Sequence, residues 1–145
     1  MKIQDFAMAG RANVILGIGV DIIKIGRFKH ILVNKNDKYI ERLTQRILHV
    51  DHELPQFKKL ILSNELNKCA NMLSGSWAAK EAVFKTLDHS DQIKFQFKEW
   101  YRSSDKHGKP SIFCDRYDKS DEEFMLSISH DNDMLIANAV RLQRK

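Results

Sequence analysis

The stretch from Asn71 to Leu87 constrains the fold of this chain more than any other. It is rich in Ala, Lys and Glu, which favour helix, and the spacing of its apolar residues predicts a helix over 76–87. One side of this helix is apolar, and a nearly opposite side carries small residues that let another element come close. A helix covered on two sides lies in the interior of a domain. The apolar side holds Leu73, Trp77, Phe84 and Leu87, and the small side holds Ala78, Ala79 and Ala82.

Two charged residues of this helix, Glu81 and Lys85, stand one turn apart at the edge of the apolar side. As a surface ion pair they would contribute only about 0.3–0.5 kcal/mol to stability. In the alternative interpretation they line a pocket, where the carboxylate and the ammonium each have a chemical role. The helix alone does not decide between the two.

A short apolar run from Val14 to Ile23 predicts a buried strand. Alternation puts Gly17, Gly19 and Asp21 on one face, opposite the face of Leu16, Ile18, Val20 and Ile22. The two glycines leave room for something to approach the backbone beside a carboxylate, and the pattern does not specify whether this is a ligand or part of the chain. Asp21 is therefore either part of a site or a cap for the segment that follows.

The remaining patterns predict further helices and then several strands. Helices are expected over 24–32 and 37–48, with a third over 57–72 that leads into the long helix. After Leu87 the period changes to two, which predicts strands over 93–98, 111–115, 124–130 and 135–142, with turns at 105–110 and 131–133. This order predicts an α+β fold, in which a long interior helix packs against a mainly antiparallel sheet.

The length of 145 residues and the 43% hydrophobic content predict one core and one domain, over 14–145. Residues 1–13 are expected to be a weakly ordered leader, which makes a poor secretory signal and at best a weak organellar one. A net charge of +5 favours an anionic partner, whether nucleic acid, an acidic protein or a phosphate-rich small molecule. The longest apolar runs are too short to span a membrane.

The cysteines and histidines give no metal or disulfide signature. Cys69 and Cys114 are isolated in the sequence, so we expect small buried side chains in a reducing, intracellular compartment. His49 and His52 are three residues apart, but no third ligand is apparent, and we interpret both as surface histidines.

Three separated motifs resemble one known family. They are Gly19-Val20-Asp21-Ile22, then Trp77-Ala78-Ala79-Lys80-Glu81 with Lys85, then Ser127-Ile128-Ser129-His130. Arg46-Ile47-Leu48 followed by Glu53-Leu54, and the turn Gly108-Lys109-Pro110, add to the resemblance. The ordered set resembles the phosphopantetheinyl transferases, specifically the short holo-acyl-carrier-protein synthase type, from about Ile15 to Val140.

The resemblance implies an enzyme and its partners. The family transfers the 4′-phosphopantetheine arm of coenzyme A to a serine of an acyl carrier protein, uses Mg²⁺ and releases adenosine 3′,5′-bisphosphate. Its short members are homotrimers whose active sites are shared between neighbouring subunits. Neither a membrane nor a nucleic acid is an expected partner, and the expected compartment is a cytoplasm or a mitochondrial matrix.

The resemblance also assigns roles to residues. Asp21 and Glu81 would hold the metal, and Lys85 would neutralise phosphate charge as the bond to the nucleotide breaks; these three are the implied catalytic residues. The serine proton would pass to Glu81 or to a water held by the metal. Coenzyme A would contact Lys85, Gly108, Lys109, Pro110, Ser129 and His130, and an acidic carrier protein would dock on Arg27 and Lys24.

The chain departs from the family at Ser76. Bacterial members often carry an arginine at this position, just before the aromatic residue of the long helix, and it binds the 3′-phosphate of coenzyme A. Lys109, or a lysine of another subunit, could compensate for its absence.

Two other functions compete with the transferase. A small basic domain that binds single-stranded nucleic acid would explain the net charge and the aromatic residues Phe95, Phe97, Trp100 and Tyr101 among basic ones. However, no RNA-binding signature is present, and alternation explains the two phenylalanines as core. A non-catalytic trimerisation domain that kept the fold is the other alternative.

Overall fold

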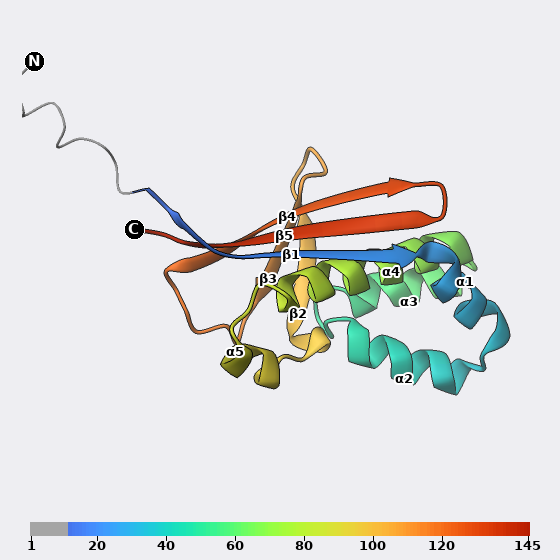
Figure 1. Cartoon of the computed structure of the whole chain (residues 1–145). Coiled ribbons are helices and arrows are strands. Elements are labelled where there is room, and N and C mark those ends of the chain that lie inside the picture. The colour runs from blue at the N-terminus through green and yellow to red at the C-terminus, as the bar shows by residue number, and fades with distance from the viewer. Residues whose placement is uncertain (1–11) are drawn as a thin grey trace, which may run out of the picture.

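The computed structural model describes residues 12–145, which form a five-stranded antiparallel sheet with helices against one face (Figure 1). The strand order is β1-β5-β4-β3-β2, so β1 and β2 are the two edges. The strands are β1 Val14–Lys24, β2 Trp100–Ser104, β3 Pro110–Cys114, β4 Glu122–Asp131 and β5 Met134–Gln143. The helices are α1 Ile25–Asn34, α2 Asp37–Ile47, α3 Leu54–Leu62, α4 Leu66–Phe84 and α5 His89–Lys94.

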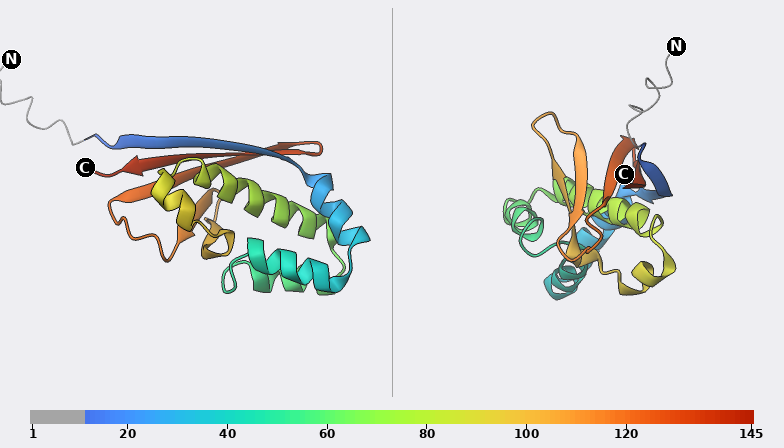
Figure 2. Two further views of the ribbon diagram at one scale, coloured as in Figure 1. Left: turned by 60° about the horizontal axis from the view of Figure 1, so that its bottom comes forward. Right: turned by 90° about the vertical axis from the view of Figure 1, so that its left-hand side faces the viewer.

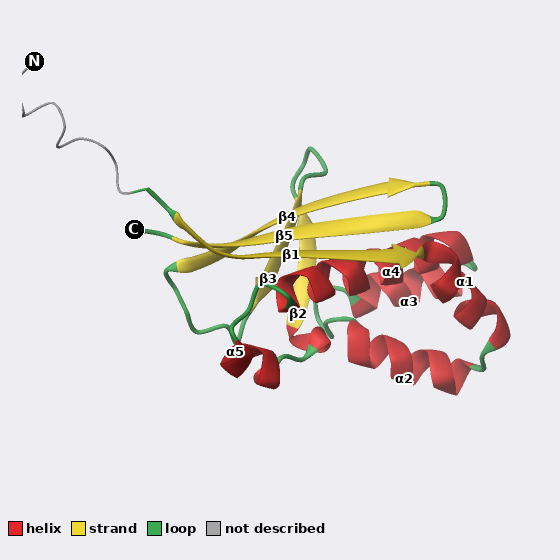
Figure 3. Cartoon of the chain, viewed as in Figure 1, coloured by secondary structure: helices red, strands yellow, loops and turns green. Residues whose placement is uncertain are grey.

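The helix α4 forms the middle layer of the fold. Figure 2 shows it directly beneath β1 and β5, with α2 and α3 on its other side, and Figure 3 shows the same division between strands and helices. Most of α4 is buried, including Cys69, Leu73 and Val83. The predicted α+β class, with a long interior helix against an antiparallel sheet, is therefore confirmed. The predicted leader falls almost entirely outside the described residues.

The contact between α4 and β1 is so close that it excludes side chains. A Cβ atom added at Gly19 would lie 1.9 Å from the carbonyl oxygen of Ala82, and one at Gly17 would lie 2.4 Å from that of Thr86. The glycines of β1 and the small side of α4 thus meet backbone to backbone. The predicted room beside the strand is filled by this helix.

The long helix begins ten residues earlier than predicted. The predicted helix over 57–72 is in fact two helices, because the chain turns between α3 and α4 at Asn64, whose φ of 56° is left-handed. Asparagine tolerates this conformation, and the backbone N–H groups of Asn64 and Glu65 bond back to Ile61 and Leu60.

The strand predicted over 93–98 is wrong. This segment forms α5 and a 3₁₀ turn over Phe97–Glu99. Phe95 and Phe97 do not share one sheet face but pack edge to face on each other, with ring centroids 5.3 Å apart. Phe95 also contacts Phe84, and Phe97 stacks on Trp77, so these aromatic rings cover the C-terminal half of α4. Rings committed to this packing are not free to stack with bases.

The strand β1 is buried on one face only. The strand was predicted to be buried, and its glycine face is covered by α4. On the other face the prediction is wrong for the single subunit, because Ile18, Val20 and Ile22 are 52–69% exposed. Their neighbours across the sheet include Val140 and Ile136 on β5, and Met125 on β4, opposite Val140, is also exposed. We call this apolar surface, made by Ile18, Val20, Ile22, Met125, Ile136 and Val140, the outer face of the sheet.

The helices of the described region give no membrane span. None of them is both long enough and apolar enough to cross a bilayer.

We predict that Gly19→Ala destabilises the fold. The new methyl group would overlap the backbone of α4 at Ala82, which cannot move without lifting the helix from the strand. We expect a loss of about 1–3 kcal/mol or more in the free energy of unfolding, measured with urea. Gly26→Ala is the control, because its methyl group would meet only the flexible side chain of Asp133, and its effect should stay below about 1 kcal/mol. Equal losses in the two variants would contradict this account of the contact.

Candidate active site

The junction of β1 and α4 brings together Asp21, Glu81 and Lys85. The Nζ atom of Lys85 donates hydrogen bonds to Asp21 Oδ1 at 3.0 Å and to the carbonyl oxygen of Val20 at 2.8 Å. Glu81 precedes Lys85 by one helical turn, and Asp21 follows directly on the glycine face of the strand. The close packing at Gly19 is therefore what places a carboxylate of the strand beside a carboxylate of the helix.

Burial and the charges of Asp21 and Lys85 all act on the pKa of Glu81. Burial raises this pKa, the negative charge of Asp21 raises it further, and the positive charge of Lys85 lowers it. Two carboxylates that repel one another therefore lie beside an ammonium group at this edge of the sheet. The carboxylates can bind a cation, and the ammonium group can bind an anion.

The residues at this junction fit a magnesium ion. Mg²⁺ in phosphate-transfer sites is usually bound by one or two carboxylates, several waters and phosphate oxygens. Asp21 and Glu81 supply two carboxylates, and a bound cation would relieve the repulsion that contributes to the raised pKa of Glu81. Lys85 would remain available for the phosphates.

The two basic residues expected at a docking surface lie next to this junction. Lys24 ends β1, and Arg27 lies in the first turn of α1; both are exposed. The guanidinium of Arg27 lies 5.8 Å from the ring centroid of Trp77, so the helix that carries Glu81 also positions this cation.

The expected coenzyme A residues do not converge on the junction within one subunit. Gly108, Lys109 and Pro110 lie at the turn between β2 and β3, at the opposite edge of the sheet from β1. Ser129 is in register with Ile22 through Ile136 and belongs to the outer side of the sheet, away from Asp21. His130 is exposed near the end of β4, two strands from β1, roughly 10 Å away.

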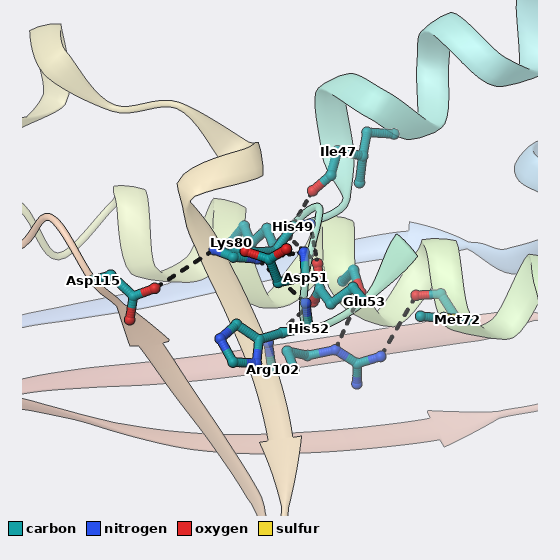
Figure 4. Close-up of polar contacts among 10 residues, drawn as sticks. Ile47, His49, Asp51, His52, Glu53, Met72, Lys80, Arg102 and Asp115 are labelled. Atoms are coloured by element: carbon teal, nitrogen blue, oxygen red, sulfur yellow. Dashed lines mark hydrogen bonds and ion pairs between the residues drawn. The ribbon is translucent and has the colours of Figure 1, made fainter. Parts of the chain in front are cut away.

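A second polar cluster lies on another side of α4 and was not predicted (Figure 4). Its centre is Glu53, which is only 3% exposed. One carboxylate oxygen accepts from Lys80 Nζ at 2.6 Å and from the backbone N–H of His49 at 2.9 Å. The other accepts from Ser76 Oγ at 3.2 Å and from the backbone N–H of Arg102 at 3.0 Å. The cluster thus ties α3, α4 and β2 together.

Lys80 is fully buried in this cluster. Its Nζ also donates to the carbonyl oxygen of Ile47 at 2.5 Å. Burial lowers the pKa of Lys80 to about 8, although the charge of Glu53 and its hydrogen bond act in the opposite direction. Glu53 and Lys80 both fall in motifs of the resemblance, and an ionisable residue on the apolar side of an interior helix was the signal that could have revealed the pair.

The interpretation of His49 as a surface residue is wrong, since only 8% of it is exposed. Asp115, far away in the sequence, lies close to both His49 and His52, so a third possible ligand does exist. However, Nδ1 of His49 accepts the backbone N–H groups of Asp51 and His52 at 3.1 and 3.3 Å. Nδ1 is thus occupied by backbone N–H groups and is not available as a metal ligand, while Nε2 faces Asp115 Oδ2 at 3.7 Å, too far for a hydrogen bond.

Comparison with known proteins identifies the family. A family model described as the 4′-phosphopantetheinyl transferase superfamily matches residues 17–139. The chain belongs to this superfamily. It is 37% identical to a holo-[acyl-carrier-protein] synthase of Geobacillus kaustophilus over 128 residues, which is 88% of each chain. The predicted family is therefore confirmed.

Solved structures of the superfamily share this fold. The acyl carrier protein synthase of Plasmodium yoelii with ADP bound matches with a TM-score of 0.73 and 26% identity, over 93% of this chain and all of the other. A holo-(acyl-carrier-protein) synthase of Bacillus anthracis in complex with CoA (3′,5′-ADP) matches with a TM-score of 0.63 and 27% identity, over 90% of this transferase and 98% of the other.

We predict that Lys80→Met strongly destabilises this transferase. Methionine fits an apolar interior but leaves the Glu53 carboxylate buried without its counter-ion. Breaking a buried pair in this way costs about 3–5 kcal/mol, which urea unfolding would measure. Lys68→Met on the same helix removes only an exposed pair with Glu65 and should change the free energy of unfolding by less than about 1 kcal/mol. A small effect at Lys80 would show that the buried pair is not needed for stability.

Proposed function

We propose that this transferase moves the 4′-phosphopantetheine group of coenzyme A to a serine of an apo-acyl carrier protein and releases adenosine 3′,5′-bisphosphate. The observation that carries the proposal is the meeting of Asp21, Glu81 and Lys85 at the junction of β1 and α4. These residues come from two of the motifs that resemble the family, and relatives matched over nearly their whole length are named holo-acyl-carrier-protein synthases.

Each of the three residues has a role that follows from its charge. Asp21 and Glu81 would hold Mg²⁺, which supplies positive charge to the pyrophosphate of coenzyme A when it is bound. The carrier serine attacks the phosphorus of the phosphopantetheine, and the bond from that phosphorus to the nucleotide phosphate breaks. Lys85, which already bridges Asp21 and the backbone of Val20, would neutralise the phosphate that leaves. The serine proton passes to Glu81 or to a water beside it.

The docking surface for the carrier protein is proposed to be the start of α1. Arg27 and Lys24 are exposed there, beside the edge strand that carries Asp21. Acidic residues of the carrier would pair with these cations, which raises the rate of encounter and orients the carrier. A serine presented from this side would meet the junction directly.

The functional unit is proposed to be a homotrimer. The outer face of the sheet exposes Ile18, Val20 and Ile22 to a degree that is unusual for a monomer. A neighbouring subunit packed on this face would cover them. Such packing would also let residues that lie far from Asp21 in one subunit, including Lys109 and His130, complete the site of its neighbour.

The proposed compartment is a cytoplasm or a mitochondrial matrix. Cys69 and Cys114 are both free thiols, which suits a reducing environment.

We predict that Glu81→Gln abolishes transfer without unfolding the chain. The amide keeps the shape of the side chain but removes a charge that the metal needs, and we expect the rate to fall by about 10²–10³. Mass spectrometry of an apo-carrier incubated with coenzyme A and Mg²⁺ measures the added phosphopantetheine. Chelation of the metal with EDTA should stop the wild-type reaction. Glu41→Gln, an exposed change on α2, is the control and should react normally; a near-normal rate for Glu81→Gln would refute the role.

We predict that Ile18→Glu disrupts the trimer. Ile18 is 69% exposed on the edge strand β1 of the outer face, so a charge there costs little in a single subunit but much in a packed interface. Light scattering after size exclusion should give the mass of three chains for the wild type and of one for the variant, which should also lose activity. Val33→Glu places the same charge on the exposed side of α1 and should leave the trimer intact. A wild-type monomer with full activity would exclude the shared site.

A further inference from the structure

The guanidinium group of Arg102 lies against α4 at Gly75 and Ser76. Its two Nη atoms lie 2.9 Å from the place that a Cβ of Gly75 would take, so a side chain at this position would push the guanidinium aside. Its Nε donates to Ser76 Oγ at 3.4 Å. Nη2 donates to the carbonyl oxygen of Met72 at 3.5 Å, as Figure 4 shows. These bonds are long and their acceptors are neutral, so they hold the group without neutralising it.

The cluster around Glu53 carries more positive than negative charge. Glu53 is its carboxylate, while Lys80 and Arg102 are its cations. Lys80 takes the direct ion pair with Glu53, and only the backbone N–H of Arg102 reaches that carboxylate. Burial accordingly lowers the pKa of the Arg102 guanidinium, although the charge of Glu53 acts to raise it. A partly buried guanidinium that forms no direct ion pair within residues 12–145 favours the binding of an anion.

The guanidinium is also accessible to such an anion. Nη1 donates no hydrogen bond to the described residues, yet it is not one of the fully buried atoms that lack a partner, which are Ser74 Oγ and Arg141 Nε. It therefore keeps some exposure to solvent. A planar guanidinium with free N–H groups matches the oxygens of a phosphate better than an ammonium does.

Arg102 also lies beside the helix position at which the resemblance implies a phosphate-binding cation. Its guanidinium stands beside Ser76, the position at which the resemblance leads us to expect an arginine. The strand β2 that carries Arg102 runs directly into the turn of Gly108, Lys109 and Pro110, which the resemblance assigns to the nucleotide. The guanidinium of Arg102, which comes from the sheet, thus lies beside Ser76 on the helix, where an arginine was expected.

We propose that Arg102 binds the 3′-phosphate of coenzyme A, in place of an arginine at position 76. This inference rests on the proposed function, because it assumes that coenzyme A is the donor. It makes Arg102 a substrate-binding residue that distinguishes coenzyme A from dephospho-coenzyme A, which has no 3′-phosphate. The cation comes from β2 instead of α4, and Gly75 and Ser76 give it space and a hydrogen-bond acceptor.

The test compares the two donors in the wild type and in Arg102→Met. We expect the wild type to prefer coenzyme A. In Arg102→Met the KM for coenzyme A should rise about 10- to 100-fold, as for a lost hydrogen bond to a charged group, while the KM for dephospho-coenzyme A stays unchanged. Arg102→Lys should recover part of the preference. Arg42→Met, which removes an exposed arginine of α2 outside the motifs of the resemblance, should leave both KM values unchanged. Equal losses with the two donors would overturn the proposal.

Direct binding separates this inference from the proposed function. Calorimetry with adenosine 3′,5′-bisphosphate and with adenosine 5′-monophosphate measures recognition of the 3′-phosphate without any transfer. Arg102→Met should weaken binding of the bisphosphate and leave the monophosphate unaffected, with the fold verified by urea unfolding. If the wild type binds the bisphosphate selectively but transfers nothing to a carrier, the proposed function fails and the role of Arg102 remains. If Arg102→Met binds the bisphosphate as the wild type does, the role of Arg102 fails.

Discussion

The structure depends on one backbone contact, between the glycine face of β1 and the small side of α4. Because Gly17 and Gly19 have no side chains, the carbonyl oxygens of Ala82 in α4 and of Thr86 just after it reach the strand itself. The helix thereby covers β1 at the edge of the sheet, and Asp21 lies within reach of Lys85 and Glu81. The same contact therefore determines the packing and the site. A side chain at Gly19 would push β1 away from α4, and Asp21 would move away from Glu81 with it.

A second side of α4 is held by charge rather than by close packing. A buried ion pair often contributes little net stability, because desolvation of both ions offsets their attraction. Glu53 does more than pair with Lys80, however, since it also accepts backbone N–H groups of the loop before α3 and of β2. Its position fixes three elements around the helix. The same arrangement leaves the guanidinium of Arg102 without a carboxylate of its own, so a structural cluster can also serve as an anion site.

The division of residues within one subunit agrees with a shared active site. The carboxylates, Lys85 and the basic start of α1 gather at the β1 edge, whereas the turn at Gly108 lies at the other edge. Between them the outer face of the sheet is apolar and exposed. A subunit built in this way is chemically incomplete and has a surface suited to a second copy.

The sequence by itself determined the family, the α+β class and the interior helix, because local spacing and short motifs carry that information. The motifs also singled out Asp21, Glu81 and Lys85, but only the fold shows that they meet, and their roles stay a prediction. Only the tertiary structure decided which face of β1 is covered, since alternation defines two faces but does not say which one meets the core. It also decided that 93–98 is not a strand, because Phe95 and Phe97 pack on Phe84 and Trp77 rather than on one side of a sheet. The Glu53–Lys80 pair and the place of Arg102 beside Ser76 arise from contacts between residues more than 25 positions apart, and a local pattern does not record such contacts.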